Sequence, residues 1–313
     1  FTLNGSNCEA VFSNATLKAG TVRIGTLAGA TNDLLRLSGK NLAFRAEDLN
    51  PAFGVGHHNR LVLDDGAVLT NANFSLSDSG IAGHHNTVSV SDGAELVVSS
   101  AFKCGKALAG DTDNAFVLGA GGRLTVSGNV SLSGTNSYFA VSNGVFTMLR
   151  DTSTSLDTYT VDFGMDKNYS SNNVFAVQGN HPVVRIPKTS LRFDNHSILR
   201  FDLPPNGYDD RSDPNYAPLD IQQIMNYTMD YEITGLDELQ KNLQKSCDIP
   251  LIRMSYRMWD GDSAKNALKR INAKLAETNP GCSMWKQDNR KTTGGEIIFL
   301  HVKAHPGLML IVR

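Results

Sequence analysis

The chain has 313 residues, enough for two ordinary domains or for one elongated all-β unit. Charged residues make up 19% of it and the formal net charge is -2 at pH 7, so it has no strong field that would attract nucleic acid or an anionic membrane. It contains no run of 18 or more apolar residues, and we therefore expect no membrane insertion. The start, Phe1-Thr2-Leu3-Asn4, lacks the basic and apolar stretches of a signal peptide, which indicates a mature or trimmed fragment.

The composition before about residue 234 is typical of short strands joined by tight turns. Glycine is abundant, with 28 residues in the chain, and Asn, Ser, Thr and Asp are plentiful. Strong helix formers are scarce in the same region. We therefore expect an all-β fold there.

An internal repeat is visible around two identical segments. Gly56-His57-His58-Asn59 recurs 27 residues later as Gly83-His84-His85-Asn86. After each Asn comes an apolar-x-apolar pair, then a turn, then another apolar residue. The same order predicts coils with the apolar positions Ala10, Phe12, Leu17; Leu35, Leu37, Leu42; Leu61, Leu63, Leu69; Val88, Val90, Leu96; Phe116, Leu118, Leu124; Phe139, Val141, Phe146; and Phe175, Val177, Val183.

The period of the repeat predicts the fold. The first apolar residues of successive coils lie 25, 26, 27, 28, 23 and 36 residues apart. A third apolar pair, Phe74 and Leu76, recurs 28 residues on as Phe102 and Cys104, so each coil has three strands. Such a period with short strands predicts a single-stranded parallel β-helix, and the handedness of parallel crossovers makes it right-handed. Residues between the inward positions, such as Val62 and Val117, should face outward.

The pattern changes after Pro204-Pro205, which divides the chain into a β-helix of about seven or more coils over 1–203 and a C-terminal α/β cap over 204–313. Thr234 and Asp237 predict the start of a helix of about 12 residues. A second helix is expected after Asp262, ending at Asn279-Pro280-Gly281. Two strands should close the chain, over 296–302 and 308–312. A cap would cover the unpaired strand edges at the end of the solenoid.

The coils of the form Asn-x-apolar-x-apolar-x-Asp-Gly-Ala, followed by the segment 198–203 and the strands between Gly295 and Val312, resemble secreted bacterial β-helix proteins of the pectin-lyase-like and autotransporter-passenger type. The resemblance covers roughly residues 7 to 203 well and the cap only loosely. It implies an extracellular or cell-surface location, with polysaccharides or host and cell-surface glycans as partners. It does not decide whether the chain is an enzyme, because fold alone does not imply function.

The four histidines of the repeated segment are the candidate metal ligands. Stacked coils would place His57 and His58 roughly 5 Å from His84 and His85, close enough to share a zinc ion. The alternative is a polar corner whose turn was duplicated. The next coil has Thr112-Asp113 instead, and no carboxylate is obviously placed to complete the site.

Other polar residues of the coils have structural interpretations. Asn59, Asn86 and Asn114 occupy equivalent turn positions and should form a ladder that satisfies backbone groups. Cys104 and Cys8 are predicted to be buried free thiols. In the cap, Cys247 and Cys282 each follow a predicted helix, and a disulfide between them is left open.

Residues suited to an enzyme are more dispersed. The expanded coil between Met148 and Asn173 contains aspartates at 151, 157, 162 and 166, but their spacing matches no calcium loop. Arg185, Lys188, Arg192 and Arg200, with Asp194 and Asp202, form a mixed-charge region near the last coil. Nothing in the sequence places these groups in one cleft, so we assign no catalytic residues and no cofactor other than possible calcium or zinc.

The sequence therefore favours a non-enzymatic, exported β-solenoid that acts as a surface spacer, adhesin or glycan-contacting scaffold. The alternative is a polysaccharide lyase or glycoside hydrolase of the same fold. A third possibility, a module like a viral tail fibre, would require a trimer seam of outward apolar residues, for which Val62, Val117 and Ala140 are weak candidates. The oligomeric state is left open.

Overall fold

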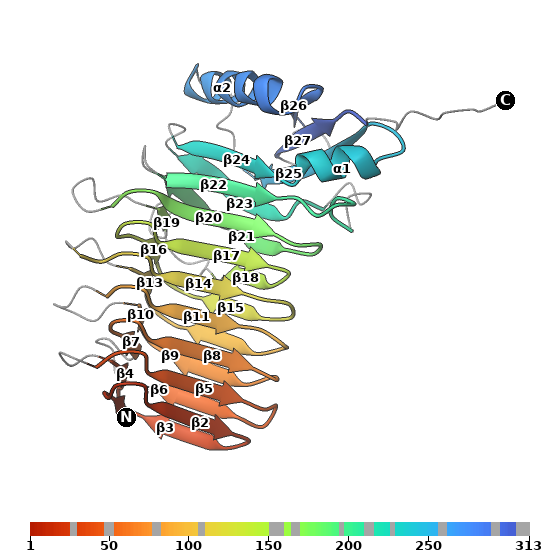
Figure 1. Cartoon of the computed structure of the whole chain (residues 1–313). Coiled ribbons are helices and arrows are strands. Elements are labelled where there is room, and N and C mark those ends of the chain that lie inside the picture. Colours follow the sequence, from red (N-terminus) through yellow and green to blue (C-terminus); the bar gives the residue numbers. More distant parts are fainter. Residues whose placement is uncertain are drawn as a thin grey trace.

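The protein is a parallel β-helix followed by a small α/β region (Figure 1). The computed structural model describes residues 1–25, 30–46, 53–76, 83–105, 110–149, 160–163, 170–193, 197–209, 216–225, 229–255, 262–288 and 295–304. Neither helix in this part of the chain combines the length and the apolar character that crossing a membrane requires.

Each coil contributes one strand to each of three walls, as the repeat predicts. The first wall consists of β2 (Glu9–Ser13), β5 (Leu34–Ser38), β8 (Arg60–Asp64), β11 (Thr87–Val90), β14 (Ala115–Leu118), β17 (Tyr138–Ser142), β20 (Asn173–Gln178), β22 (Ser197–Asp202) and β24 (Asp230–Thr234). All neighbours in this wall pair in parallel.

The second and third walls are joined into one large sheet. The second wall contains β3 (Thr16–Ala19), β6 (Ala43–Ala46), β9 (Val68–Asn71), β12 (Glu95–Val98), β15 (Arg123–Val126) and β18 (Val145–Met148). The third contains β1 (Thr2–Leu3), β4 (Val22–Ile24), β7 (Phe53–Val55), β10 (Phe74–Ser75), β13 (Phe102–Cys104), β16 (Val130–Leu132) and β19 (Thr160–Phe163). The long strand β21 (Val183–Phe193) runs through both walls and pairs with β18, β19 and β23 (Leu219–Met225).

The register confirms the predicted stacking of apolar residues. Leu61 lies beside Leu35 on one side and Val88 on the other, and Phe116 is followed by Phe139 and Phe175. These inward side chains are buried, and successive phenylalanines contact one another along the solenoid axis. Stacked coils thus share one continuous apolar core, which no single coil could form alone.

Two of the residues predicted for the second wall are out of register, although Leu42 is buried in the core as expected. Phe44, and not Leu42, lies between Leu17 and Leu69, and Val184, and not Val183, lies beside Phe146. The turns between the first and second walls differ in length by one or two residues from coil to coil. Counting forward from a turn therefore misplaces the next inward residue.

Parallel pairing continues beyond residue 203, where the sequence analysis places the start of the cap. Strand β24 pairs in parallel with β22, and β25 (Cys247–Met254) pairs in parallel with β23. Strand β27 (Glu296–Val302) then pairs antiparallel with β25, and β26 (Cys282–Asp288) pairs antiparallel with β27. The position of a domain boundary at 203 stays a prediction.

The helices of the C-terminal region agree only in part with the sequence analysis. Helix α2 (Asp262–Thr278) confirms the second prediction, and its Ala267, Ile271 and Leu275 are buried. Helix α1 (Leu236–Asn242) is shorter than expected. Its N-cap is Gly235, with φ 78°, because Thr234 ends strand β24. Strand β27 has the predicted bounds, whereas the strand expected over 308–312 lies outside the described residues.

The possible disulfide between Cys247 and Cys282 is ruled out by strand order. Neither cysteine forms a disulfide, and both lie opposite Val302, on either side of β27. Two strand spacings of about 4.8 Å separate them, more than the roughly 7 Å that a disulfide allows between Cα atoms. Cys104 is a fully buried free thiol as predicted, whereas Cys8 is only partly buried.

Candidate functional site

One corner of the solenoid, where the chain enters the first wall, has the same backbone conformation in successive coils. In seven coils a residue two positions before the strand, or one position before it for Asn172, has a positive φ, in the left-handed region that Asn, Asp and His adopt more readily than other side chains. We call these residues the left-handed column. They are Asn7, Asn32, His58, His85, Asp113, Asn136 and Asn172, with φ between 50° and 60°.

Except for Cys8 after Asn7, which is partly buried, the residue after each member of this column is buried. Its side chain bridges neighbouring coils: the backbone N–H of Asn59 donates to Oδ1 of Asn86 over 3.0 Å, and that of Asn86 donates to Oδ1 of Asn114 over 3.2 Å. The amide of Asn114 also donates to the carbonyl of Gly83 over 2.8 Å. The predicted asparagine ladder is thus confirmed, and its role is structural.

The repeated histidines lie together on the outside of this corner. The rings of His58 and His85 are stacked, with centroids 4.7 Å apart and planes 9° apart, and the centroid of His57 is 4.3 Å from that of His84. Nδ1 of His84 is 3.3 Å from Nδ1 of His85. Among the described residues, His58, His84 and His85 each offer a ligand atom within 4.8 Å of the others, and His57 is not in this group.

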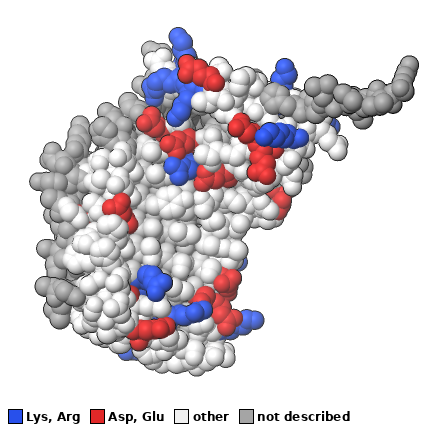
Figure 2. Space-filling model, in the orientation of Figure 1, with Lys and Arg blue, Asp and Glu red and all other residues white. Residues whose placement is uncertain are grey.

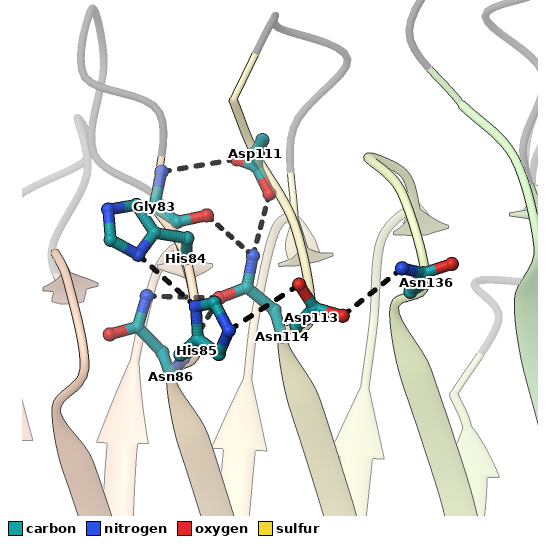
Figure 3. Close-up of polar contacts among 8 residues, drawn as sticks. All are labelled: Gly83, His84, His85, Asn86, Asp111, Asp113, Asn114 and Asn136. Atoms are coloured by element: carbon teal, nitrogen blue, oxygen red, sulfur yellow. Dashed lines mark hydrogen bonds and ion pairs between the residues drawn. The ribbon is translucent and has the colours of Figure 1, made fainter.

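A carboxylate does lie at this corner, contrary to the expectation from the sequence. Oδ2 of Asp113 is 3.6 Å from Nε2 of His85, and Asn136 donates its amide to Oδ1 of Asp113 over 3.2 Å (Figure 3). Asp113 is the next member of the left-handed column, 28 residues after His85. This spacing equals one repeat and was visible in the sequence. Only the register of the stacked coils shows that it brings Asp113 next to His85.

Burial and mutual repulsion favour the neutral form of two of these imidazoles. Desolvation lowers the pKa of His57, and the neighbouring His58 lowers it further. The pKa of His84 is also lowered, first by desolvation and then by His57, His58 and His85, against a smaller opposite effect from Asp113. A neutral imidazole keeps a lone pair on one nitrogen, which is the form that binds metals.

The histidine corner borders a shallow hollow of about 470 Å³ on the outside of the first wall. His58 and His85 line it together with Glu9, Arg60 and Thr87, which come from three different coils. The hollow therefore connects the corner to the outward side chains of the wall.

Further along the first wall, the outer face is free of charge. We call the partly or fully exposed outward side chains of β11, β14, β17 and β20 the neutral strip: Thr87, Ser89, Ala115, Val117, Tyr138, Ser142, Val174 and Gln178. Ala140 and Ala176 lie on the same face but are fully buried. Figure 2 shows charged residues gathered towards the two ends of the visible face, with few in the middle. Ion pairs lie at either end of the first wall, Arg36 with Asp64 at 2.5 Å and Arg200 with Glu232 at 2.7 Å.

Tyr138 is the one aromatic side chain of the neutral strip. Its hydroxyl donates to Oε1 of Gln178, 2.9 Å away on β20, so the side chain extends along the strip towards the next coil. Burial raises its pKa, and Asp202 raises it further against an opposite effect of Arg200. The sequence did not single out Tyr138 or Gln178, because only the register shows that both lie on one face, with Tyr138 beside Val174 and Gln178 beside Ser142.

The residues considered for an enzyme do not converge within the described part of the chain. Arg192 makes two bonds to Asp162, of 2.5 and 2.7 Å, on the second and third walls' sheet. Arg200 and Asp202 lie on β22 of the first wall, and Arg185 donates to the carbonyl of Ala217. The structure does not describe residues 151, 157, 166 and 194, nor the side chain of Lys188.

Comparison with known proteins gives no match: no family model, no curated protein and no solved structure is similar to this chain.

Proposed function

We propose that this chain is an exported, cell-surface β-solenoid that acts as a contact scaffold and binds an extended, neutral glycan along the neutral strip. The observation that supports this is the strip itself: four consecutive strands of one wall present uncharged side chains. The resemblance to secreted β-helix proteins points in the same direction.

The chemistry of the strip fits a sugar chain better than an acidic polymer. Ser89, Ser142 and Gln178 carry groups that hydrogen-bond hydroxyls, while Val117 and the ring of Tyr138 supply apolar surface for the faces of sugar rings. An acidic polysaccharide would call for cations, and this strip has none. Its four strands stack about 4.8 Å apart, so the strip extends along the solenoid axis and can accommodate an extended ligand.

The test is retention on a panel of neutral and acidic polysaccharides, using the wild-type chain and two matched variants. Val117→Lys places a charge in the middle of the neutral strip. Val97→Lys places the same charge at a half-buried, outward position of β12 on the second wall. We expect Val117→Lys to weaken binding to a neutral glycan by at least about tenfold, or ~1.4 kcal/mol, and Val97→Lys to bind like the wild type.

Two outcomes would contradict the proposal. Equal loss of binding in both variants would mean that the neutral strip is not the contact surface. Turnover of any polysaccharide, detected as unsaturated products or new reducing ends in the presence of calcium, would instead support the lyase or hydrolase alternative. In that case the Asp162 and Arg192 pair would be the first residues to replace.

A further inference from the structure

We propose that His58, His84 and His85 form a binding site for a single divalent transition-metal ion, and that zinc is the ion this set of donors fits best. The inference does not depend on the proposed function. It rests on the position of three ligand atoms within 4.8 Å of one another and on the groups that surround them.

The distance between His84 and His85 already matches that of two ligands of one ion. Their Nδ1 atoms are 3.3 Å apart. Two imidazole nitrogens that bind zinc tetrahedrally, each at roughly 2.0–2.1 Å, lie about 3.3–3.4 Å from each other. A metal ion between these two nitrogens therefore requires little movement of either side chain.

The third ligand comes from the preceding coil. His58 and His85 are both members of the left-handed column, and the backbone N–H of His58 donates to the carbonyl of His84 over 2.8 Å. The shared backbone conformation stacks the two rings and keeps His58 beside the pair. Because the coils are locked in register by the buried asparagines, the site is built on a rigid frame.

Asp113 acts on the site as an orienting residue. Its carboxylate lies 3.6 Å from Nε2 of His85, on the other side of the ring from Nδ1. This contact favours a proton on Nε2 and leaves the lone pair of Nδ1 for the metal, the arrangement of a carboxylate that orients a metal-binding histidine. Asp113 is held in turn by Asn136, whose Oδ1 accepts from Asn172 over 3.4 Å.

His57 has a different role from its three neighbours. Its ring packs at 4.3 Å from that of His84, but none of its atoms belongs to the group of three ligand atoms in the described part of the chain. His57 therefore supports the ring of His84. A fourth metal position is left for water or for a ligand group that enters from the hollow beside His58 and His85.

The test uses the full chain without a polyhistidine tag, stripped of metal with a chelator and then titrated with Zn²⁺ and with Co²⁺. We expect one equivalent of Zn²⁺ to bind, and the Co²⁺ spectrum to show a tetrahedral site without a sulfur-to-metal band. The ¹⁵N resonances of Nδ1 in His84 and His85 should shift on binding.

Substitutions distinguish the proposed metal ligands from the residues that surround them. His84→Ala and His85→Ala should each weaken binding by more than the roughly 10- to 100-fold that loss of an orienting residue costs. Asp113→Asn, an exposed substitution that keeps the fold, should weaken metal binding by roughly 10- to 100-fold. His181→Ala is the control and should leave affinity and stoichiometry unchanged, since His181 pairs with Asp209 elsewhere on the solenoid.

Three results would overturn the proposal. The first is the absence of stoichiometric Zn²⁺ binding. The second is binding that survives in His85→Ala with unchanged affinity. The third is a sulfur-to-metal band with Co²⁺, which would assign the ion to cysteines.

Discussion

Asn86 donates its side-chain amide to Oδ1 of Asn114 over 3.0 Å, and both residues are fully buried. The same Asn86 donates to the carbonyl of Leu76 over 3.1 Å and accepts from the backbone of Asn59 over 3.0 Å. One side chain thus satisfies polar groups in its own coil and in both neighbours. This is the reason that a polar residue can occupy a fully buried position in each coil.

Replacing Asn86 should therefore destabilise the solenoid strongly. In Asn86→Ala, the N–H of Asn59 and the carbonyl of Leu76 lose their partner inside the corner. Each buried polar group left unsatisfied costs about 1–3 kcal/mol, so we expect a loss of roughly 2–6 kcal/mol in the free energy of unfolding by urea. Thr87→Ala, at the exposed neighbouring position, is the control and should change stability by less than about 0.5 kcal/mol. A small effect of Asn86→Ala would show that water replaces the ladder.

The phenylalanine stack should contribute as much as the ladder. Phe102 is fully buried and contacts Phe74 at 5.2 Å and Phe116 at 4.8 Å between ring centroids. Phe102→Ala should cost about 3–5 kcal/mol, because the cavity lies between coils that are fixed by their strands. Phe102→Leu should cost less, since leucine restores most of the volume. Equal losses in the two variants, measured by denaturant unfolding, would mean that the contacts between rings matter more than volume.

The cysteines should differ in their reactivity with a thiol reagent. Cys104 is fully buried, and burial raises the pKa of its thiol well above the ordinary range. Burial also raises the pKa of Cys282. We expect both to be protected in the native protein, while Cys8 and Cys247, which are partly exposed, react faster. Unfolding without reductant should expose all four thiols, and recovery of only two would reveal a disulfide.

High pH should destabilise the protein through Tyr208. This side chain is fully buried, and burial, with Tyr216 and Asp202, raises its pKa well above the ordinary value of about 10. The unfolded chain loses this proton near pH 10 whereas the folded chain keeps it, so stability is present below that pH and falls as the pH rises. Tyr208→Phe should show a smaller decrease in unfolding free energy between about pH 9 and pH 11. An unchanged decrease would assign the alkaline sensitivity to other groups.

Much of the scaffold could be predicted from the sequence, because the apolar repeat depends only on short-range spacing. The identical Gly-His-His-Asn segments and the recurring apolar pairs predict three strands per coil, and the pairing of Leu61 with Val88 follows. Helix α2 was equally predictable from its apolar spacing and its Asn279-Pro280-Gly281 end. The sequence also indicates the asparagine ladder, because Asn59, Asn86 and Asn114 recur at one place in the repeat.

Tertiary structure decided what depends on exact turn lengths and on strand order. A turn that is two residues longer than in the preceding coil moves the position in register with Leu17 from Leu42 to Phe44. Strand β27 inserts between Cys247 and Cys282 and separates them. The candidate site needs the same information. That four histidines gather at one corner is visible in the sequence, but the orientation of their nitrogens and the approach of Asp113 to His85 are fixed only when the buried ladder locks the coils in register. Local spacing determines which residues share a face, whereas only the packed coils determine the distances on which chemistry depends.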